Sequence, residues 1–184
     1  MTNTETDAEK SEKEWLTRLD QLRRGSGLRI DGRGHWWHLE DPFEHPRVIK
    51  ALNLGLDWSP TQAVVPLSHP FDEWRGEATV RIGEQWCYVD CEYSPFLILK
   101  LSPSSDQRDL IATLNTQERL SLGPLTTKEE ILYSRLRFDR LAKFSPAAQL
   151  QVAEWLCEVE GERQGGDLML QYQGREWLIH DECK

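Results

Sequence analysis

The chain has 184 residues, of which 29% are charged, and a formal net charge of −9 at pH 7. A chain of this length buries about 70% of its extended surface, so it needs no disulfide or metal to hold a core. The acidic balance argues against non-specific binding to nucleic acid or to an acidic membrane, because both need a basic surface, and no apolar run reaches the roughly 20 residues that span a bilayer.

Residues 1–12 are polar and acidic, and they lack the basic and apolar segments of a secretory signal. We expect them to form a disordered leader. Without an export signal, the protein is predicted to be cytoplasmic and its cysteines to be reduced thiols. The cysteines are Cys87, Cys91, Cys157 and Cys183.

The first predicted module covers residues 13–68 and has the order helix, hairpin, helix, strand. Four apolar residues recur at helical spacing and predict a helix over residues 13–24. They are Trp15, Leu16, Leu19 and Leu22. A hairpin is predicted around the Asp31-Gly32 turn, and Pro46 suits the first turn of a helix over residues 46–54. A short apolar strand over residues 62–67 completes the module.

Residues 69–76 have no clear period, so we place the module boundary there. The second module, residues 77–184, is strand-rich and has one long helix that begins at Ser145-Pro146. Its predicted strands are 78–82, 86–91, 96–101, 110–114, 119–122, 168–172 and 177–180. Residues 131–138 alternate as a strand does and are favoured as one, although a capping box at 127–130 also permits a helix. Runs of strands with a segregated helix predict the α+β class.

A Gly-x-x-Trp-x-x-x-Asp pattern occurs in each of three predicted hairpins, beginning at Gly34, Gly83 and Gly174. Three copies of one hairpin indicate internal duplication, so the two modules are predicted to be related. Because a catalytic residue is usually needed only once, three equal copies favour a structural role. The tryptophans expected to be equivalent core anchors are Trp37, Trp86 and Trp177.

His35 and His38 are the most tempting candidates for metal binding or general-base catalysis. Residues three apart on a strand point to opposite faces, so two partly exposed histidines are favoured over a shared metal. Cys87 and Cys91 would lie about 13 Å apart on a strand, too far for one tetrahedral ion. No Gly-rich phosphate loop or Gly-x-Ser-x-Gly elbow is present. The sequence therefore predicts no catalytic residue, metal or cofactor, and an enzyme is the less favoured class.

A local basic cluster interrupts the acidic chain. Its members are Arg135, Arg137, Arg140 and Lys143. If residues 131–138 form a strand, Arg135 and Arg137 share one face and can clamp a phosphate or a carboxylate. The alternative is a solvated face that pairs with the surplus of carboxylates.

Three motifs occur in order between residues 28 and 124. The first motif contains Trp36, His38, Pro42, Phe43, His45, Pro46, Ile49 and Leu52. The second is Glu92-Tyr93-Ser94-Pro95-Phe96, and the third combines Asn115 with Gly123-Pro124. Together they resemble the bacterial domain-of-unknown-function 1285 (DUF1285) family, with His45 in place of the family's Arg and Tyr93 in place of its Asp.

The resemblance implies two related modules, the second a barrel or antiparallel sheet like a pleckstrin-homology (PH) domain. It also implies a role in signalling, with a small nucleotide-based ligand between the modules and no established enzymatic activity. We therefore predict a non-enzymatic protein with a ligand site lined by Trp36, His38, His45, Arg135 and Arg137. The alternatives are a protein–protein interaction module with exposed tryptophans and a metal-assisted hydrolase that uses His35 or His38. Neither nucleic acid nor a membrane is expected as a partner.

Overall fold

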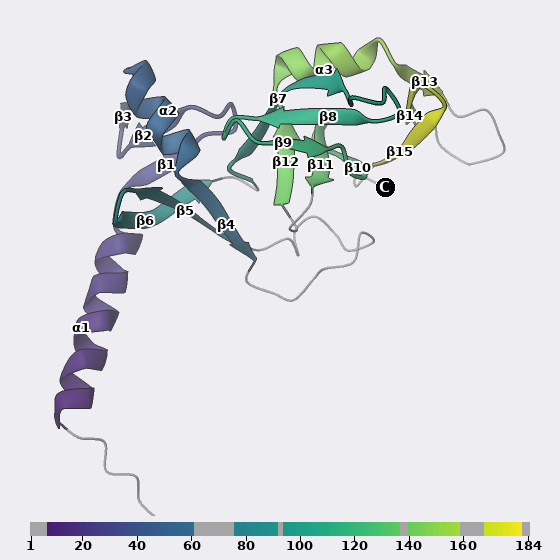
Figure 1. Cartoon of the computed structure of the whole chain (residues 1–184). Helices are drawn as coiled ribbons and strands as arrows, with labels where there is room; N and C mark the ends of the chain where they lie inside the picture. Colours follow the sequence, from purple (N-terminus) through teal and green to yellow (C-terminus); the bar gives the residue numbers. More distant parts are fainter. Residues whose placement is uncertain (1–6, 61–75, 92–93, 137–139, 159–167, 182–184) are drawn as a thin grey trace, which may run out of the picture.

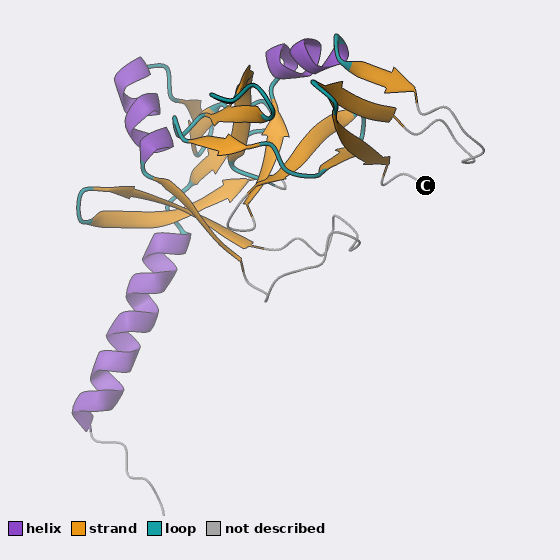
Figure 2. Cartoon of the chain, turned by 45° about the vertical axis from the view of Figure 1, so that its right-hand side comes forward, coloured by secondary structure: helices purple, strands orange, loops and turns teal. Residues whose placement is uncertain are grey.

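The computed structural model describes residues 7–60, 76–91, 94–136, 140–158 and 168–181, which form three helices and two β-sheets (Figures 1 and 2). The helices are α1 (Asp7–Arg24), α2 (Pro46–Leu54) and α3 (Pro146–Ala153). The six-stranded sheet contains β1 (Leu28–Ile30), β2 (Trp36–His38), β3 (Asp41–Pro42), β4 (Leu56–Pro60), β5 (Gly76–Ile82) and β6 (Gln85–Cys91). The nine-stranded sheet contains β7 (Phe96–Pro103), β8 (Leu110–Leu114), β9 (Arg119–Ser121), β10 (Leu125–Lys128), β11 (Ile131–Leu136), β12 (Arg140–Phe144), β13 (Leu156–Glu158), β14 (Leu168–Tyr172) and β15 (Arg175–Asp181). The predicted α+β class is confirmed.

The six-stranded sheet has the order β3-β2-β1-β6-β5-β4. Its central pair, β1 and β6, is parallel, and the other neighbouring pairs are antiparallel. The N-terminal part of α1 stands clear of both sheets in Figures 1 and 2. None of the helices in the described part of the chain is long and apolar enough to cross a membrane.

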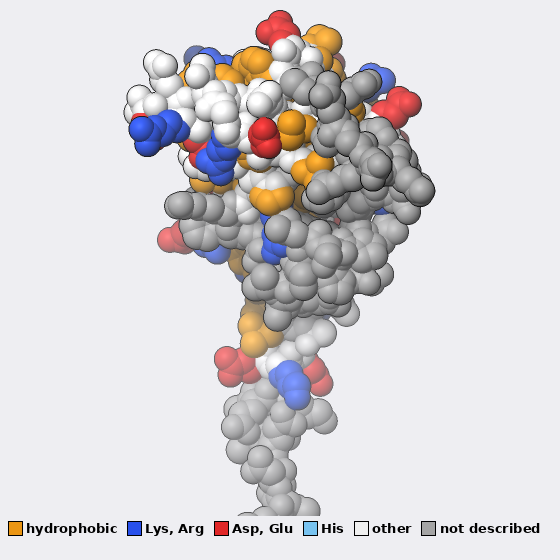
Figure 3. Space-filling model, turned by 90° about the vertical axis from the view of Figure 1, so that its right-hand side faces the viewer, with side chains coloured by type: hydrophobic (Ala, Val, Ile, Leu, Met, Phe, Trp, Pro, Cys, Tyr) orange, Lys and Arg blue, Asp and Glu red, His pale blue; other side chains and the backbone are white. Residues whose placement is uncertain are grey.

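The nine-stranded sheet has the order β13-β14-β15-β10-β11-β12-β7-β8-β9. It is mixed rather than purely antiparallel, because β10 pairs with β15 and β12 with β7 in parallel. The expectation was a barrel or an antiparallel sheet, and the described strands form an open sheet and no closed barrel. Hairpin signals specify only strands that are adjacent in sequence, so these long-range parallel pairs could not be foreseen. Figure 3 faces the β13–β15 end and shows hydrophobic, basic and acidic side chains mixed over its described surface.

One hydrophobic core joins the two sheets. It includes Trp36, Leu52 and Val80 together with Phe96, Ile98 and Phe144. The predicted module boundary lies almost wholly outside the described residues, at 69–75. The strands that follow it, β5 and β6, pair with β4 and β1 of the preceding segment. The division at residues 68 and 77, and the relationship between the two modules, stay predictions.

The three predicted hairpins are confirmed as β1–β2, β5–β6 and β14–β15. The glycine of each turn has a positive φ, of 85° at Gly34, 62° at Gly83 and 80° at Gly174, which explains why glycine occupies these positions. The equivalence of the tryptophans is wrong, however. Trp177 is buried, whereas Trp37 and Trp86 are half-buried, because it is Trp36 that points inward from β2.

Several element bounds differ from the predictions. α1 begins at Asp7 rather than at residue 13, because the Ala, Glu and Lys residues that precede the apolar stripe are good helix formers. Residues 1–6 and the predicted strand at 62–67 lie outside the described residues. The strand at β11 is confirmed up to Leu136. The expected long helix is only eight residues, and its Leu150 is 73% exposed.

Candidate functional site

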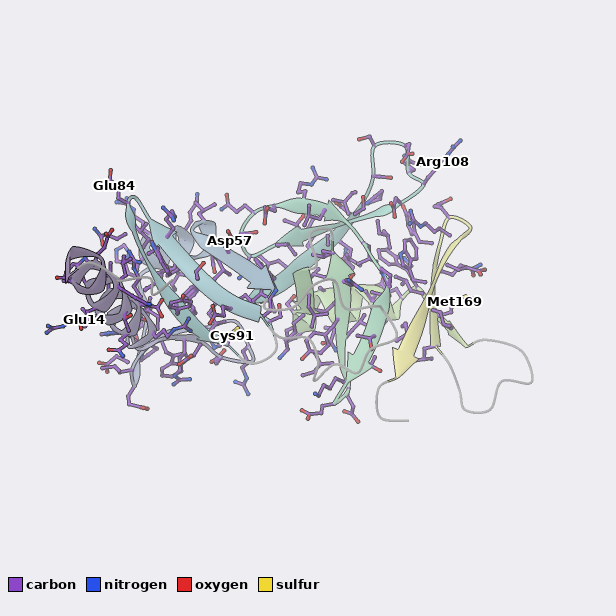
Figure 4. All side chains as sticks on the ribbon, turned by 90° about the horizontal axis from the view of Figure 1, so that it is seen from below. Glu14, Asp57, Glu84, Cys91, Arg108 and Met169 are labelled. Carbon is purple, nitrogen blue, oxygen red and sulfur yellow. The ribbon has the colours of Figure 1, made fainter. Side chains whose placement is uncertain are left out.

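A wide groove of about 770 Å³ lies along the six-stranded sheet and reaches the turn between β8 and β9. Its walls therefore come from both sheets. The charged and aromatic lining residues are Asp57, Glu77, Arg81, Trp86, Tyr88 and Glu118. Figure 4 shows the molecule from below, with Asp57 labelled on β4 and Glu84 in the turn between β5 and β6.

Strand alternation places the groove's charged and aromatic side chains on one face of β5 and β6. Thr79 pairs with Tyr88 and Arg81 pairs with Trp86 across the two strands, so these side chains share the outer face. Residues that alternate with them turn to the core, and three of these are at most 5% exposed. The three are Ala78, Val80 and Val89. The amphipathic hairpin thus contributes to the core with one face and lines the groove with the other.

The last turn of α1 docks on this outer face through its two arginines. The guanidinium of Arg23 lies 4.0 Å from the ring centroid of Trp86, and that of Arg24 lies 4.0 Å from the ring centroid of Tyr88. Arg24 also donates to the carboxylate of Glu77 at 2.6 Å. Cation–π stacking and an ion pair therefore hold the helix end on the sheet.

Asp20 of α1 completes this contact. Its carboxylate accepts a hydrogen bond from the Tyr88 hydroxyl at 3.0 Å and another from Arg24 at 2.8 Å. The bond from Arg24, followed by that from Tyr88, lowers the pKa of Asp20. Burial and the bond to Asp20 raise the pKa of Tyr88. The bonds to Glu77 and Asp20 raise the pKa of Arg24, so Asp20 and Arg24 are both held in their ionised forms.

Trp36, the residue expected to stack on a ligand, is 1% exposed and lies in the core. Its indole nitrogen donates to the side-chain oxygen of Asn53 at 2.8 Å. The amide of Asn115 donates to the same oxygen at 3.3 Å and to the carbonyl of Pro95 at 3.1 Å. The side-chain oxygen of Asn115 in turn accepts from the Leu97 backbone at 3.1 Å. This network ties β2 and α2 to β7 and the β8–β9 turn.

The two histidines of the predicted ligand site lie near the first hairpin. His38 ends β2 and is exposed, and His45 is exposed as the N-cap of α2. The ring nitrogen Nδ1 of His45 accepts the backbone N–H of Arg47 at 3.3 Å, which gives this side chain a capping role.

The predicted arginine pair belongs to the other sheet. Arg135 is half-buried on β11 and pairs in register with Leu141 of β12, while Arg137 lies outside the described residues. Lys143 on β12 donates to the backbone carbonyl of Gly32, so this member of the basic cluster joins the two sheets. None of the four described members of the predicted site, Trp36, His38, His45 and Arg135, is among the described residues that line the groove. Their grouping around one ligand stays a prediction.

His35 interacts with Asp31 rather than with another histidine. Asp31 accepts hydrogen bonds from the backbone of Arg33 at 2.9 Å, from the backbone and ring of His35 at 2.9 and 3.2 Å, and from the Trp37 indole at 3.1 Å. Burial raises the pKa of Asp31, but the hydrogen bonds lower it by a larger amount. The net result is a pKa of about 2. The arrangement stabilises the turn between β1 and β2.

No cluster of three His, Cys, Asp or Glu side chains that could hold a metal ion occurs among the described residues. Cys87 and Cys91 are free thiols on the inner side of β6, packed against the core. Burial, with a smaller effect from the neighbouring Asp90, raises the pKa of Cys91 to about 12. This thiol therefore stays protonated at neutral pH and is a poor nucleophile and a poor metal ligand.

No protein-family model matches the sequence, and no curated protein does so either. A crystal structure of a DUF1285 family protein from Silicibacter pomeroyi aligns with a TM-score of 0.56 and 11% identity, over 84% of this chain and 79% of that one. The chain has a DUF1285-like fold. A second DUF1285 family protein, from Shewanella baltica, aligns with a TM-score of 0.48 and 14% identity, over 70% of this chain and 91% of that one.

The DUF1285-like motifs converge in this structure. Trp36 belongs to the first motif, Pro95 to the second and Asn115 to the third, and all three meet in the Asn53 hydrogen-bond network. The motifs thus mark a structural junction. Sequence reasoning missed the groove, although the alternation of Glu77, Thr79 and Arg81 along β5 was a visible signal of a polar outer face.

Proposed function

We propose that the protein binds a small polar ligand in the groove between the outer face of β5–β6 and the β8–β9 turn. The observation that carries this proposal is the convergence of charged and aromatic side chains from both sheets on one groove. Its volume falls within the range of roughly 300–1,000 Å³ that is typical of small-molecule sites. The chemistry of the lining favours ligands with charged and planar groups.

The DUF1285 resemblance adds context to the proposal. It makes nucleotides the first ligands to test and signalling in the cytoplasm the proposed setting. Among the charged lining residues, Asp57, Glu77 and Glu118 outnumber Arg81. Repulsion by this acidic excess opposes phosphate groups, so a nucleotide would have to gain its affinity from the aromatic rings and Arg81.

Thermal unfolding with a panel of nucleotides and polar metabolites tests the proposal. A ligand at 100 times its Kd stabilises the folded state by about 2.7 kcal/mol. We expect the shift to be lost in Arg81→Gln, which removes a charge from the groove. It should be kept in Arg47→Gln, which removes an exposed charge from α2 outside the groove. A panel that shifts nothing, or a shift that survives Arg81→Gln unchanged, contradicts binding in this groove.

A second function, protein–protein interaction, is favoured by the apolar residues of α1. Trp15, Leu16 and Leu22 are 60%, 55% and 65% exposed, although they form the apolar stripe that predicted the helix. Exposed apolar patches on soluble proteins often mark contact sites. Cross-linking in cells with the wild type and with a Trp15→Ser/Leu22→Ser variant tests this function. Cross-linked proteins lost only in the variant would support it, and identical patterns would oppose it.

A further inference from the structure

Three residues serve two purposes in this structure. Glu77, Trp86 and Tyr88 line the groove, and the same residues hold the last turn of α1 through Arg23 and Arg24. The groups that a groove ligand would meet are therefore already in contact with guanidinium groups of the chain itself. The intramolecular contact identifies the chemistry that this end of the groove accepts.

The geometry is that of cation recognition. Trp and Tyr rings attract cations placed within about 6 Å of the ring centroid, and Trp does so most strongly. Both guanidinium groups lie within this range, at 4.0 Å from their rings. The carboxylate of Glu77 adds a charge-assisted hydrogen bond of 2.6 Å to Arg24. Two aromatic rings beside a carboxylate match a guanidinium or alkylammonium group and repel a phosphate.

A free cation can take the place of the α1 arginines in this contact. Arg24 and Glu77 are 49% and 37% exposed at their side chains, so water and solutes can reach the ion pair. The large apolar residues of α1, such as Trp15 and Leu22, are more than half exposed and do not anchor the helix in the core. Polar and cation–π contacts of this type are individually weak. A ligand with the same chemistry can therefore displace the helix end.

We propose that Glu77, Trp86 and Tyr88 form a cation-binding subsite of the groove, which Arg23 and Arg24 occupy here and which accepts a guanidinium or alkylammonium ligand in their place. This inference rests on the proposed function of the groove. Ligand binding and docking of α1 are then coupled, because both use the same three side chains. By linkage, the docked helix end weakens the binding of the cation by the same factor by which the bound cation weakens the docking of α1.

The test compares agmatine, which carries a guanidinium and an ammonium group, with butylurea, its planar uncharged counterpart, and with AMP. Full-length wild type and Arg23→Gln/Arg24→Gln are titrated by NMR, following the indole N–H of Trp86, which Trp86→Phe assigns. We expect the agmatine Kd to fall at least fivefold in the double variant, because the competing guanidinium groups are gone. Adding Glu77→Gln should abolish this gain, whereas the matched surface variant Arg47→Gln should leave the Kd at the wild-type value.

Butylurea should bind neither form, because the subsite requires a positive charge. In the wild type, agmatine should also speed amide hydrogen exchange in the last turn of α1, which a purely structural contact would not show. Equal agmatine affinities in the wild type and the double variant, or no binding by the double variant, overturn the subsite. If AMP then still shifts groove resonances in an Arg81-dependent way, the groove function stands without the cation subsite. If no probe binds at all, the proposed function fails with it.

Discussion

The neighbouring residues Trp36 and Trp37 provide a sharp test of which side of β2 faces the core. Trp36 is 1% exposed, and its truncation to Ala removes a fully buried ring, a change that costs about 3–5 kcal/mol. The short bond from its indole to Asn53 is also lost, but the amide of Asn115 still donates to the same oxygen, so this adds only about 1 kcal/mol. The expected loss for Trp36→Ala is about 4–6 kcal/mol.

Trp37→Ala is the matched control, because it removes the same side chain one position along the same strand. Trp37 is half-buried on the outer face, where its ring lies 4.5 Å from the guanidinium of Arg29 and its indole donates to Asp31. The loss of one cation–π contact and one partly exposed hydrogen bond costs about 1–2 kcal/mol. The two variants should therefore differ by about 3 kcal/mol.

Urea unfolding followed by circular dichroism measures this difference as a gap in midpoint of about 1 M or more, with unchanged slopes. Since the expected loss for Trp36→Ala approaches the total stability of a small domain, Trp36→Phe serves as a milder second variant. It keeps most of the ring and should cost about 1–3 kcal/mol. Equal losses for Trp36→Ala and Trp37→Ala, or a larger one for Trp37→Ala, would refute the inward orientation of Trp36.

Three further outcomes follow from the local geometry. The pKa of Asp31, about 2, lies below its unfolded value near 3.9, so the ionised side chain stabilises the folded state, by about 1 kcal/mol after a discount for solvent screening. This stabilisation is present above pH 4 and is lost as the pH falls from about 4 to 2. Asp31→Asn should therefore flatten the curve of unfolding free energy against pH in that window. An added Cβ at Gly123 would lie 1.6 Å from the backbone oxygen of Arg135, so Gly123→Ala should cost about 3 kcal/mol or more in urea unfolding, whereas Gly25→Ala, with 3.4 Å to its nearest atom, should not. Ser145 accepts a backbone N–H in the first turn of α3, and Ser145→Ala should lower the free energy of unfolding by about 1 kcal/mol; an unchanged midpoint would contradict the capping role.

Local signals in the sequence predicted much of the fold. The three hairpins appear where glycines were expected to turn the chain, and α3 begins at the predicted Ser145 cap with Pro146 in its first turn. These features depend on residues close together in sequence. The parallel pairs β1–β6, β10–β15 and β7–β12 could not be predicted, because strand alternation does not specify which distant strands become neighbours.

The apolar stripe of α1 shows a different limit. Helical spacing predicted the helix, but Leu16 and Leu22 of its apolar stripe are exposed. The helix docks instead through Arg23 and Arg24, whose spacing carries no amphipathic signal. Hydrophobic periodicity identifies the element, whereas its contact with the sheet depends on aromatic and acidic partners more than 50 residues away in sequence.

The DUF1285 resemblance identifies the fold of this chain but not its function, and there is a physical reason for this difference. Trp36, Pro95 and Asn115, one from each motif, are joined by hydrogen bonds that fix how the first hairpin and α2 meet the nine-stranded sheet. A buried network of this kind requires specific donors and acceptors, so it leaves a recognisable pattern wherever the junction is kept. Glu77 and Tyr88, in contrast, lie outside the motifs, on the outer face of the six-stranded sheet. The proposed ligand chemistry therefore has to be tested on the groove of this chain and on the arginines at its edge.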